Sequence, residues 1–237
     1  MPTEDCELGY LAHTGAGPNR GVVMIHDVWG LSDHTRDLAR RMAAEDFAVL
    51  AIDLYRREAE VKIEDPGAWM RALSDVQVLE DIQAAAEFLA AHPSTGGHGV
   101  GVTGFCMGGT YALLAACGCR GLSAAVPFYG LLSHEHGLLH DPAGSDPTRK
   151  PREPLAALAD LSCPLLCFFG AQDEYVPLSD VDLLRERLAA GDKESEVVVY
   201  PNAGHAFMND TRSDAYRAEE AEEAWARSLA FLQERIP

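Results

Sequence analysis

A cysteine in a glycine-rich turn is the clearest candidate for chemistry in this sequence. Residues 104–109 read Gly-Phe-Cys-Met-Gly-Gly and follow a short run rich in valine. This pattern of glycine, any residue, nucleophile, any residue, glycine is typical of a sharp strand-to-helix turn, which needs small residues beside the nucleophile. Because a helix N-terminus carries a partial positive charge that favours a thiolate, we predict that Cys106 is a nucleophile. A buried cysteine in an ordinary glycine-rich turn is the alternative interpretation.

An acid and a histidine follow the cysteine in the order that such a site requires. Asp173 lies just beyond an apolar run at 164–169, and His205 lies in the loop after another run at 196–200. The chain order nucleophile, acid, histidine is one of those found in hydrolases built on α/β sheets. We therefore predict that Asp173 orients His205 and that His205 removes the proton of Cys106. The alternatives are a loop-capping aspartate and a surface histidine.

A fourth loop can complete the site. Residues 26–30 read His-Asp-Val-Trp-Gly and follow the first strong apolar run. In this architecture such a loop lies beside the nucleophile and supplies one backbone N–H of an oxyanion hole, the other coming from the residue after the nucleophile. We assign these two donors to Val28 and Met107. Asp27 and Trp29 are then expected near the site, where Trp29 either lines the acyl pocket or serves in packing.

The elements that must position these residues alternate along the chain. Short, continuous apolar runs predict strands buried on both faces, whereas longer segments with helical spacing lie between them. The predicted strands are 21–26, 47–52, 99–104, 124–129, 164–169 and 196–200. The predicted helices are 32–44, 66–91, 107–116, 178–190 and 213–233.

This alternation predicts an α/β fold with a mostly parallel sheet and helices on both faces. Ligands of such sheets bind at the carboxyl ends of the strands, where all the candidate residues fall. With 237 residues and 47% hydrophobic content, we expect one domain spanning 1–237. Residues 131–162 contain four prolines and read as either a lid or a plain insertion at the rim.

Charge and composition exclude several classes of function. The formal net charge of -18 repels phosphate backbones and anionic membranes, so we expect neither nucleic acid nor a membrane as partner. The acidic start of the chain lacks the pattern of a secretion signal, and six cysteines are too few for a disulfide scaffold. We therefore expect a cytoplasmic protein, either a monomer or a small homo-oligomer.

The chain resembles the dienelactone hydrolase family of the α/β-hydrolase superfamily. The resemblance runs from about residue 20 to the C-terminus and depends on a cysteine in the nucleophile turn together with an Asp-Leu-Tyr strand end. The matching segments are 26–31, 53–55, 104–109, 172–173, 176–177 and 204–207. The resemblance implies a Cys, His and Asp triad that cleaves small carboxylic esters or lactones through a thioester, with no metal and no organic cofactor.

Two positions depart from the family pattern and leave the substrate open. Asp27 stands where well-known members have a glutamate that contacts the resting thiol, and Asn209 stands where they have a substrate-binding arginine. Candidate substrate-binding residues are therefore Arg56, Arg57, Arg71, Asn209 and Arg212. A neutral ester or lactone is as credible a substrate as an anionic dienelactone. Aryl esters, thioesters and phosphotriesters are alternative substrates for the same triad, and a catalytically silent ligand-binding domain is the alternative of another class.

Overall fold

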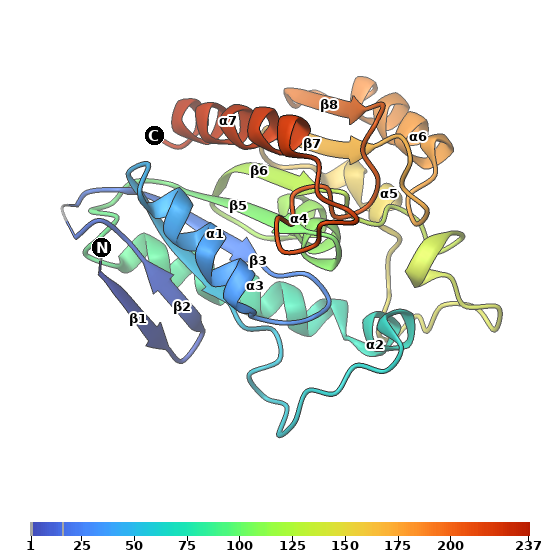
Figure 1. The fold of residues 1–237 in the computed structure, drawn as a ribbon, viewed down its shortest axis with the longest axis horizontal. Helices are drawn as coiled ribbons and strands as arrows, with labels where there is room; N and C mark the ends of the chain where they lie inside the picture. Colours follow the sequence, from blue (N-terminus) through green and yellow to red (C-terminus); the bar gives the residue numbers. More distant parts are fainter. Residues whose placement is uncertain (1, 16) are drawn as a thin grey trace.

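A single sheet of eight strands forms the centre of the molecule (Figure 1). The structure, a computed structural model, describes residues 2–15 and 17–237. The strands are β1 (Thr3–Cys6), β2 (Gly9–Ala12), β3 (Arg20–Ile25), β4 (Phe47–Ile52), β5 (Val100–Phe105), β6 (Leu122–Phe128), β7 (Leu165–Gly170) and β8 (Ser195–Tyr200). Their order across the sheet is β1-β2-β4-β3-β5-β6-β7-β8. The six strands β3 to β8 run parallel to one another.

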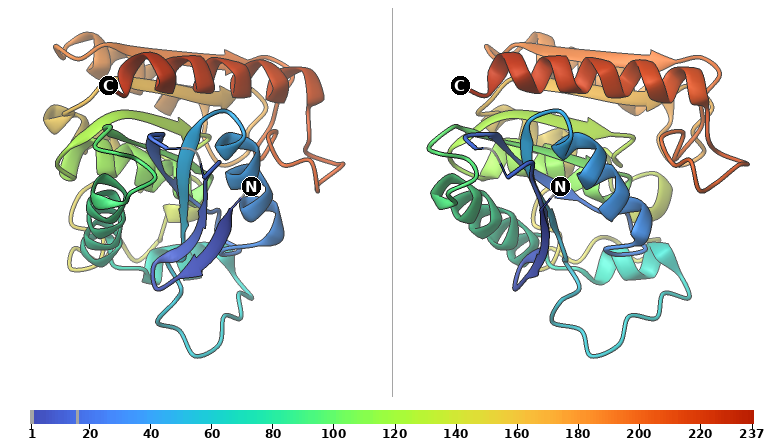
Figure 2. Two further views of the ribbon diagram at one scale, coloured as in Figure 1. Left: turned by 90° about the vertical axis from the view of Figure 1, so that its left-hand side faces the viewer. Right: turned by 60° about the vertical axis from the view of Figure 1, so that its left-hand side comes forward.

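Helices cover both faces of this sheet. They are α1 (Asp33–Ala43), α2 (Pro66–Ala72), α3 (Asp75–Ala91), α4 (Met107–Gly118), α5 (Pro154–Ala157), α6 (Leu178–Ala189) and α7 (Ala218–Arg235), with short 3₁₀ turns η1 (Gly137–Leu139) and η2 (Leu158–Asp160). Helices α1 and α7 lie on one face, whereas α3 and α4 lie on the other (Figure 2). None of the helices in the described residues is long and apolar enough to cross a membrane.

The predicted α/β fold with a mostly parallel sheet is confirmed, and the six predicted strands correspond to β3 through β8. The central strands are apolar on both faces because helices cover both; every residue of β4 and β5, for example, is buried. Strands β1 and β2, which extend the sheet beyond β4 through antiparallel pairing, were not predicted from the sequence. The exposed polar side chains of β1 gave no apolar run to detect.

One helix prediction was wrong. The segment 66–91 forms two helices because the chain leaves helical geometry at Leu73 and Ser74, where ψ is 142° and 116°. The side chain of Ser74 accepts a hydrogen bond from the backbone N–H of Gln77 and so caps α3. The last helix also begins at Ala218, later than the predicted residue 213.

The segment 131–162 is fastened to the body of the protein by a buried ion pair. Lys150 Nζ lies 2.6 Å from Asp75 Oδ1 at the start of α3 and 2.9 Å from the hydroxyl of Tyr111 in α4. The Tyr111 hydroxyl also donates to Asp75 Oδ1 at 2.9 Å. All three side chains are buried, so each charge depends on its partner. The same segment contributes η1, which packs against α2.

Candidate active site

The carboxyl ends of four parallel strands bring the candidate residues to one edge of the sheet. Cys106 follows β5, Asp173 follows β7, His205 follows β8, and the loop with Val28 follows β3. Each strand ends at the same edge because the strands run parallel, so loops far apart in sequence meet there. This is the edge at which the sequence analysis expected a site.

Cys106 occupies a strained backbone position between β5 and α4. Its φ of 55° and ψ of -116° lie outside the regions that side-chain-bearing residues normally adopt. Two hydrogen bonds hold this turn, one from Cys106 N–H to Phe128 O at 3.1 Å and one from Thr110 N–H to Cys106 O at 3.1 Å. Strain of this kind persists only where the surrounding structure enforces it, and it is concentrated at functional sites.

The glycines of the turn permit close backbone packing around Cys106. A Cβ on Gly104 would lie 2.1 Å from Gly108 O, and a Cβ on Gly108 would lie 2.2 Å from Ile25 O. Both distances are shorter than any side chain can tolerate, so both positions require glycine. Because Gly108 has no side chain, the end of β3 at Ile25 packs against the start of α4, which brings the loop after β3 beside Cys106.

Asp173 and His205 form a buried pair. Asp173 Oδ2 lies 2.8 Å from His205 Nδ1, and the carboxylate side chain has no exposed surface. Its other oxygen accepts hydrogen bonds from the backbone N–H of Tyr175 at 2.8 Å and of Val176 at 3.2 Å. The carboxylate is therefore fixed at both oxygens, and it can hold the imidazole in one orientation.

The second ring nitrogen of His205, Nε2, is not bonded to Asp173. Nε2 is buried and has no aligned hydrogen-bond partner among the described residues, a looseness that is common in resting catalytic sites. Burial acts to lower the pKa of His205, but the negative charge of Cys106 and the hydrogen bond with Asp173 outweigh it and raise the pKa to about 10. Tyr129 and Tyr175 flank the imidazole edge-on, with ring centroids 5.1 Å and 5.0 Å away.

A small cavity lies above Cys106. It has a volume of about 90 Å³. Its lining residues are Asp27, Val28, Trp29, Pro66, Cys106, Leu138, Tyr175, His205, Ala206, Asn209 and Arg212. A larger hollow of about 350 Å³ between α5 and α6 has neither cysteine nor histidine in its lining, so we place the candidate site at the smaller cavity.

The residues assigned to the oxyanion hole lie next to Cys106. Val28 lines the cavity, and Met107 is the first residue of α4, where a backbone N–H has no partner within its own helix. Asp27 also lines the cavity, and its Oδ1 accepts a hydrogen bond from Trp29 N–H at 2.9 Å. Trp29 is 55% exposed, so it forms part of the mouth of the cavity.

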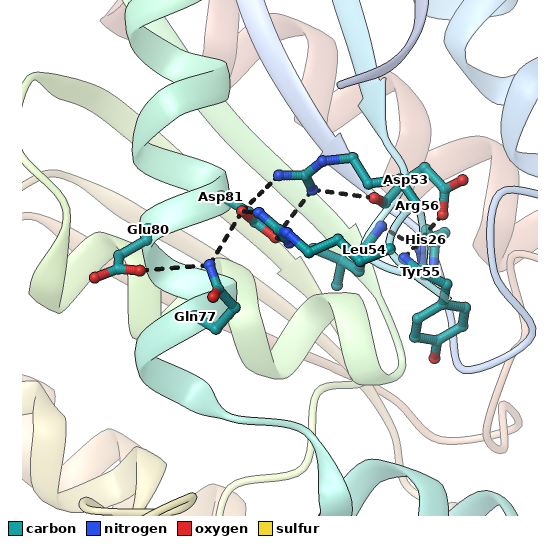
Figure 3. A network of polar contacts seen from close by, with 9 residues as sticks. His26, Asp53, Leu54, Tyr55, Arg56, Gln77, Glu80 and Asp81 are labelled. Atoms are coloured by element: carbon teal, nitrogen blue, oxygen red, sulfur yellow. Dashed lines mark hydrogen bonds and ion pairs between the residues drawn. The ribbon is translucent and has the colours of Figure 1, made fainter. Parts of the chain in front are cut away.

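Two of the candidate substrate-binding residues line the cavity, and two others contact helix α3. Asn209 and Arg212 line the cavity, and Arg212 also contacts Asp214 at 2.9 Å. Arg56 instead turns toward Asp81 on α3, which lies 2.6 Å away (Figure 3). Arg57 contacts the same carboxylate at 2.6 Å.

Arg71 does not line the cavity but contacts the backbone of the 131–162 segment, which does. Its guanidinium donates to the carbonyl oxygens of Leu138 at 2.9 Å and His140 at 3.3 Å. Leu138 is part of η1 and reaches the cavity from the 131–162 segment. Leu138, Tyr175 and Pro66 line the cavity but were not among the predicted site residues. Tyr175 follows the predicted acid by two residues, which is the one local signal that could have indicated it.

The sheet order and the strained turn at Cys106 between β5 and α4 define an enzyme of the α/β-hydrolase type. The family model described as "Dienelactone hydrolase family" matches residues 8–236. The chain belongs to the dienelactone hydrolase family and is a carboxylic ester hydrolase.

Named relatives agree with this assignment. A "Putative carboxymethylenebutenolidase" of Escherichia coli (strain K12) is 33% identical over 92% of this chain and 78% of its own length. A "Probable 2-oxo-3-(5-oxofuran-2-ylidene)propanoate lactonase" of Bradyrhizobium is 32% identical over 97% of this chain and 90% of its own. A solved structure described as a "Putative Dienelactone Hydrolase" from Klebsiella pneumoniae has a TM-score of 0.83 and 32% identity, covering 94% of this chain and 91% of that one.

Proposed function

We propose that the chain hydrolyses a small carboxylic ester or lactone with Cys106 as nucleophile, His205 as base and Asp173 as the residue that orients the base. The observation that carries this proposal is the arrangement of His205, whose Nδ1 is tied to a buried carboxylate while its Nε2 is left for the cysteine. A free thiol has a pKa of about 8.5, so little thiolate is present at neutral pH without a neighbouring base. His205 provides that base.

The reaction proceeds in two halves. The Cys106 sulfur attacks the carbonyl carbon, and the charge that develops on the carbonyl oxygen is stabilised by the backbone N–H groups of Val28 and Met107. The proton held at His205 Nε2 passes to the departing oxygen, which leaves a thioester on Cys106. His205 then takes a proton from water as the water attacks the thioester, and the acid product leaves with the Cys106 thiol restored.

The cavity offers one place for a substrate carboxylate. Asn209 and Arg212 supply the donors on one side, because the Asn209 carbonyl already accepts from Thr211 and leaves the amide NH₂ free to donate. If an anionic lactone is the substrate, Arg212→Gln raises KM for it while KM for a neutral lactone stays the same.

The decisive experiment compares two cysteine variants. Cys106→Ala abolishes hydrolysis of a p-nitrophenyl ester and of a simple lactone, and it abolishes the acyl adduct seen by intact-protein mass spectrometry after a short exposure to the ester. Cys163→Ala is the matched control because Cys163 is also buried, and burial raises the pKa of its thiol to about 12. A folded Cys106→Ala enzyme that still turns over substrate rules out the scheme. Wild-type protein without ester hydrolysis and with slow alkylation of Cys106 would instead indicate a catalytically silent domain.

A further inference from the structure

The loop after β3 contains two peptide units whose orientation is fixed from both sides. In the first unit, between Asp27 and Val28, the carbonyl oxygen of Asp27 accepts from His26 Nδ1 at 2.6 Å and from Gly30 N–H at 3.3 Å. In the second, between Val28 and Trp29, the carbonyl oxygen of Val28 accepts from the Tyr55 hydroxyl at 2.8 Å. The N–H of that second unit donates to Asp27 Oδ1 at 2.9 Å.

Of the four polar groups in these two peptide units, one has no hydrogen-bond partner among the described residues. The N–H of Val28 has no acceptor within residues 2–15 and 17–237, although Val28 is only 3% exposed. A buried and unpaired backbone N–H costs about 1–3 kcal/mol and is rare in folded proteins. In a planar trans peptide the N–H points away from the carbonyl oxygen, so the bonds that hold the Asp27 carbonyl also hold the Val28 N–H in the opposite direction.

His26 can hold the Asp27 carbonyl because it is neutral and has one defined tautomer. Its Nε2 accepts a hydrogen bond from Leu54 N–H at 3.1 Å, so the ring proton is on Nδ1 (Figure 3). Complete burial lowers the pKa of His26, which keeps the ring uncharged at neutral pH. The ring therefore joins the end of β3 to Leu54, the second residue after β4.

The hydroxyl of Tyr55 contacts both residues assigned to the oxyanion hole, Val28 and Met107. It donates to Val28 O and also lies 3.3 Å from the sulfur of Met107. Gly30, with φ of 89°, has no side chain to obstruct the ring, since a Cβ there would lie 3.2 Å from Tyr55 Cδ2. Burial is the main cause that raises the pKa of Tyr55, so its hydroxyl keeps the proton that it donates.

We propose that His26 and Tyr55 are positioning residues that aim the Val28 N–H at the carbonyl oxygen of the substrate. This inference rests on the proposed function, because it assigns the two residues to the reaction of Cys106. Neither side chain touches the substrate. Each acts by fixing one of the two peptide units around Val28, and each comes from a different strand end.

The first test uses Tyr55→Phe, which removes one hydroxyl and keeps the ring. Removing an oxyanion donor outright costs about 10²- to 10³-fold in rate, so loss of its alignment should lower kcat for a p-nitrophenyl ester about tenfold and leave KM unchanged. Tyr111→Phe is the matched control, since it also removes a buried hydroxyl with a 2.9 Å hydrogen bond, there to Asp75. It should lower Tm and leave kcat unchanged.

A second readout separates positioning from general damage to the site. Alkylation of Cys106 by iodoacetamide needs the thiolate but develops no charged carbonyl oxygen, so its rate and pH dependence should be unchanged in Tyr55→Phe. Binding of a trifluoromethyl ketone, whose adduct with Cys106 does carry that oxygen, should weaken by the same factor as kcat falls. Tyr55→Phe with wild-type kcat, or with alkylation reduced in parallel, overturns the proposal.

His26 provides an independent test with a rescue. His26→Leu leaves Leu54 N–H without its partner and leaves Asp27 O with only the 3.3 Å hydrogen bond from Gly30 N–H, so it should lower kcat more than Tyr55→Phe does. His26→Gln restores one donor and one acceptor and should recover most of the rate. A His26→Gln enzyme no better than His26→Leu contradicts the assignment, and if His26→Leu does not fold, Tyr55→Phe decides alone. Wild-type activity that Cys106→Ala abolishes shows that the proposed function holds even where this inference fails.

Discussion

Replacing Asp173 with asparagine should disable the base while leaving the site in place. One oxygen of Asp173 is occupied by the N–H groups of Tyr175 and Val176, and the other lies 2.8 Å from His205 Nδ1. Asparagine has a single oxygen, and the two N–H groups require it, so the amide NH₂ must face Nδ1. The imidazole then carries its proton on Nε2 and cannot accept one from Cys106.

The magnitude follows from two contributions. A hydrogen bond to a charged group contributes roughly 1.5–3 kcal/mol, which corresponds to about 10- to 150-fold in rate. The two effects overlap, because this hydrogen bond acts through general-base catalysis by His205, and loss of that catalysis typically costs about 10²- to 10⁴-fold. We therefore expect the acylation rate of Asp173→Asn at pH 7 to fall by about 10²- to 10⁴-fold, with partial recovery at high pH, where the thiolate forms without His205.

The assay is single-turnover acylation by a p-nitrophenyl ester, followed across pH. Asp180→Asn is the matched control, because Asp180 is a buried carboxylate 3.1 Å from the Nδ1 of His136 and lies outside the cavity lining. It should leave acylation unchanged. A folded Asp173→Asn enzyme that loses less than about tenfold at pH 7 would refute the reasoning, since even the hydrogen bond alone contributes that much.

Two further predictions concern buried charges. Cys106→Ala removes the negative charge that raises the pKa of His205, so NMR titration should show a His205 pKa well below about 10. The stability that His205 contributes in the wild-type protein is complete below pH 6.5 and is lost as pH rises through about 10. In the variant this loss should be smaller and should be complete at a lower pH, and coincident denaturation profiles of the two proteins against pH would contradict this. Lys150→Met leaves the Asp75 carboxylate buried without its cation and should cost about 3–5 kcal/mol in the free energy of unfolding by urea denaturation. A change below about 1 kcal/mol, the upper range for exposed ion pairs, would show that the pair does not fasten the 131–162 segment.

Local patterns predicted most of the fold and the three principal candidate residues. Strands buried on both faces are visible as unbroken apolar runs, and the turn at Cys106 needs glycine at positions 104 and 108 because backbone atoms of α4 and β3 lie there. Asp173 and His205 could be found because the chain order of such residues follows from the order of parallel strands. The apolar runs and the glycine-rich turn each lie within a few consecutive residues, whereas the chain order of the candidate residues is read along the whole sequence.

What the sequence could not show depends on partners far apart in the chain. His26 contacts Leu54, and Lys150 contacts Asp75, across 28 and 75 positions. No periodicity records such a pair, because either member alone looks like an ordinary polar residue. The break at Ser74 was missed for another reason. The helical spacing continues through it, and only the capping hydrogen bond marks the start of a new helix.

The close packing at Gly104 and Gly108 separates the framework of the turn from its chemistry. Backbone atoms of β3, β5 and α4 hold Cys106 in its strained conformation, and the sulfur itself takes no part in that support. An oxygen in place of the sulfur would therefore meet the same surroundings. A change from thiol to hydroxyl at Cys106 therefore alters a single atom of one side chain, whereas neither glycine can change without dismantling the junction of two strands and a helix.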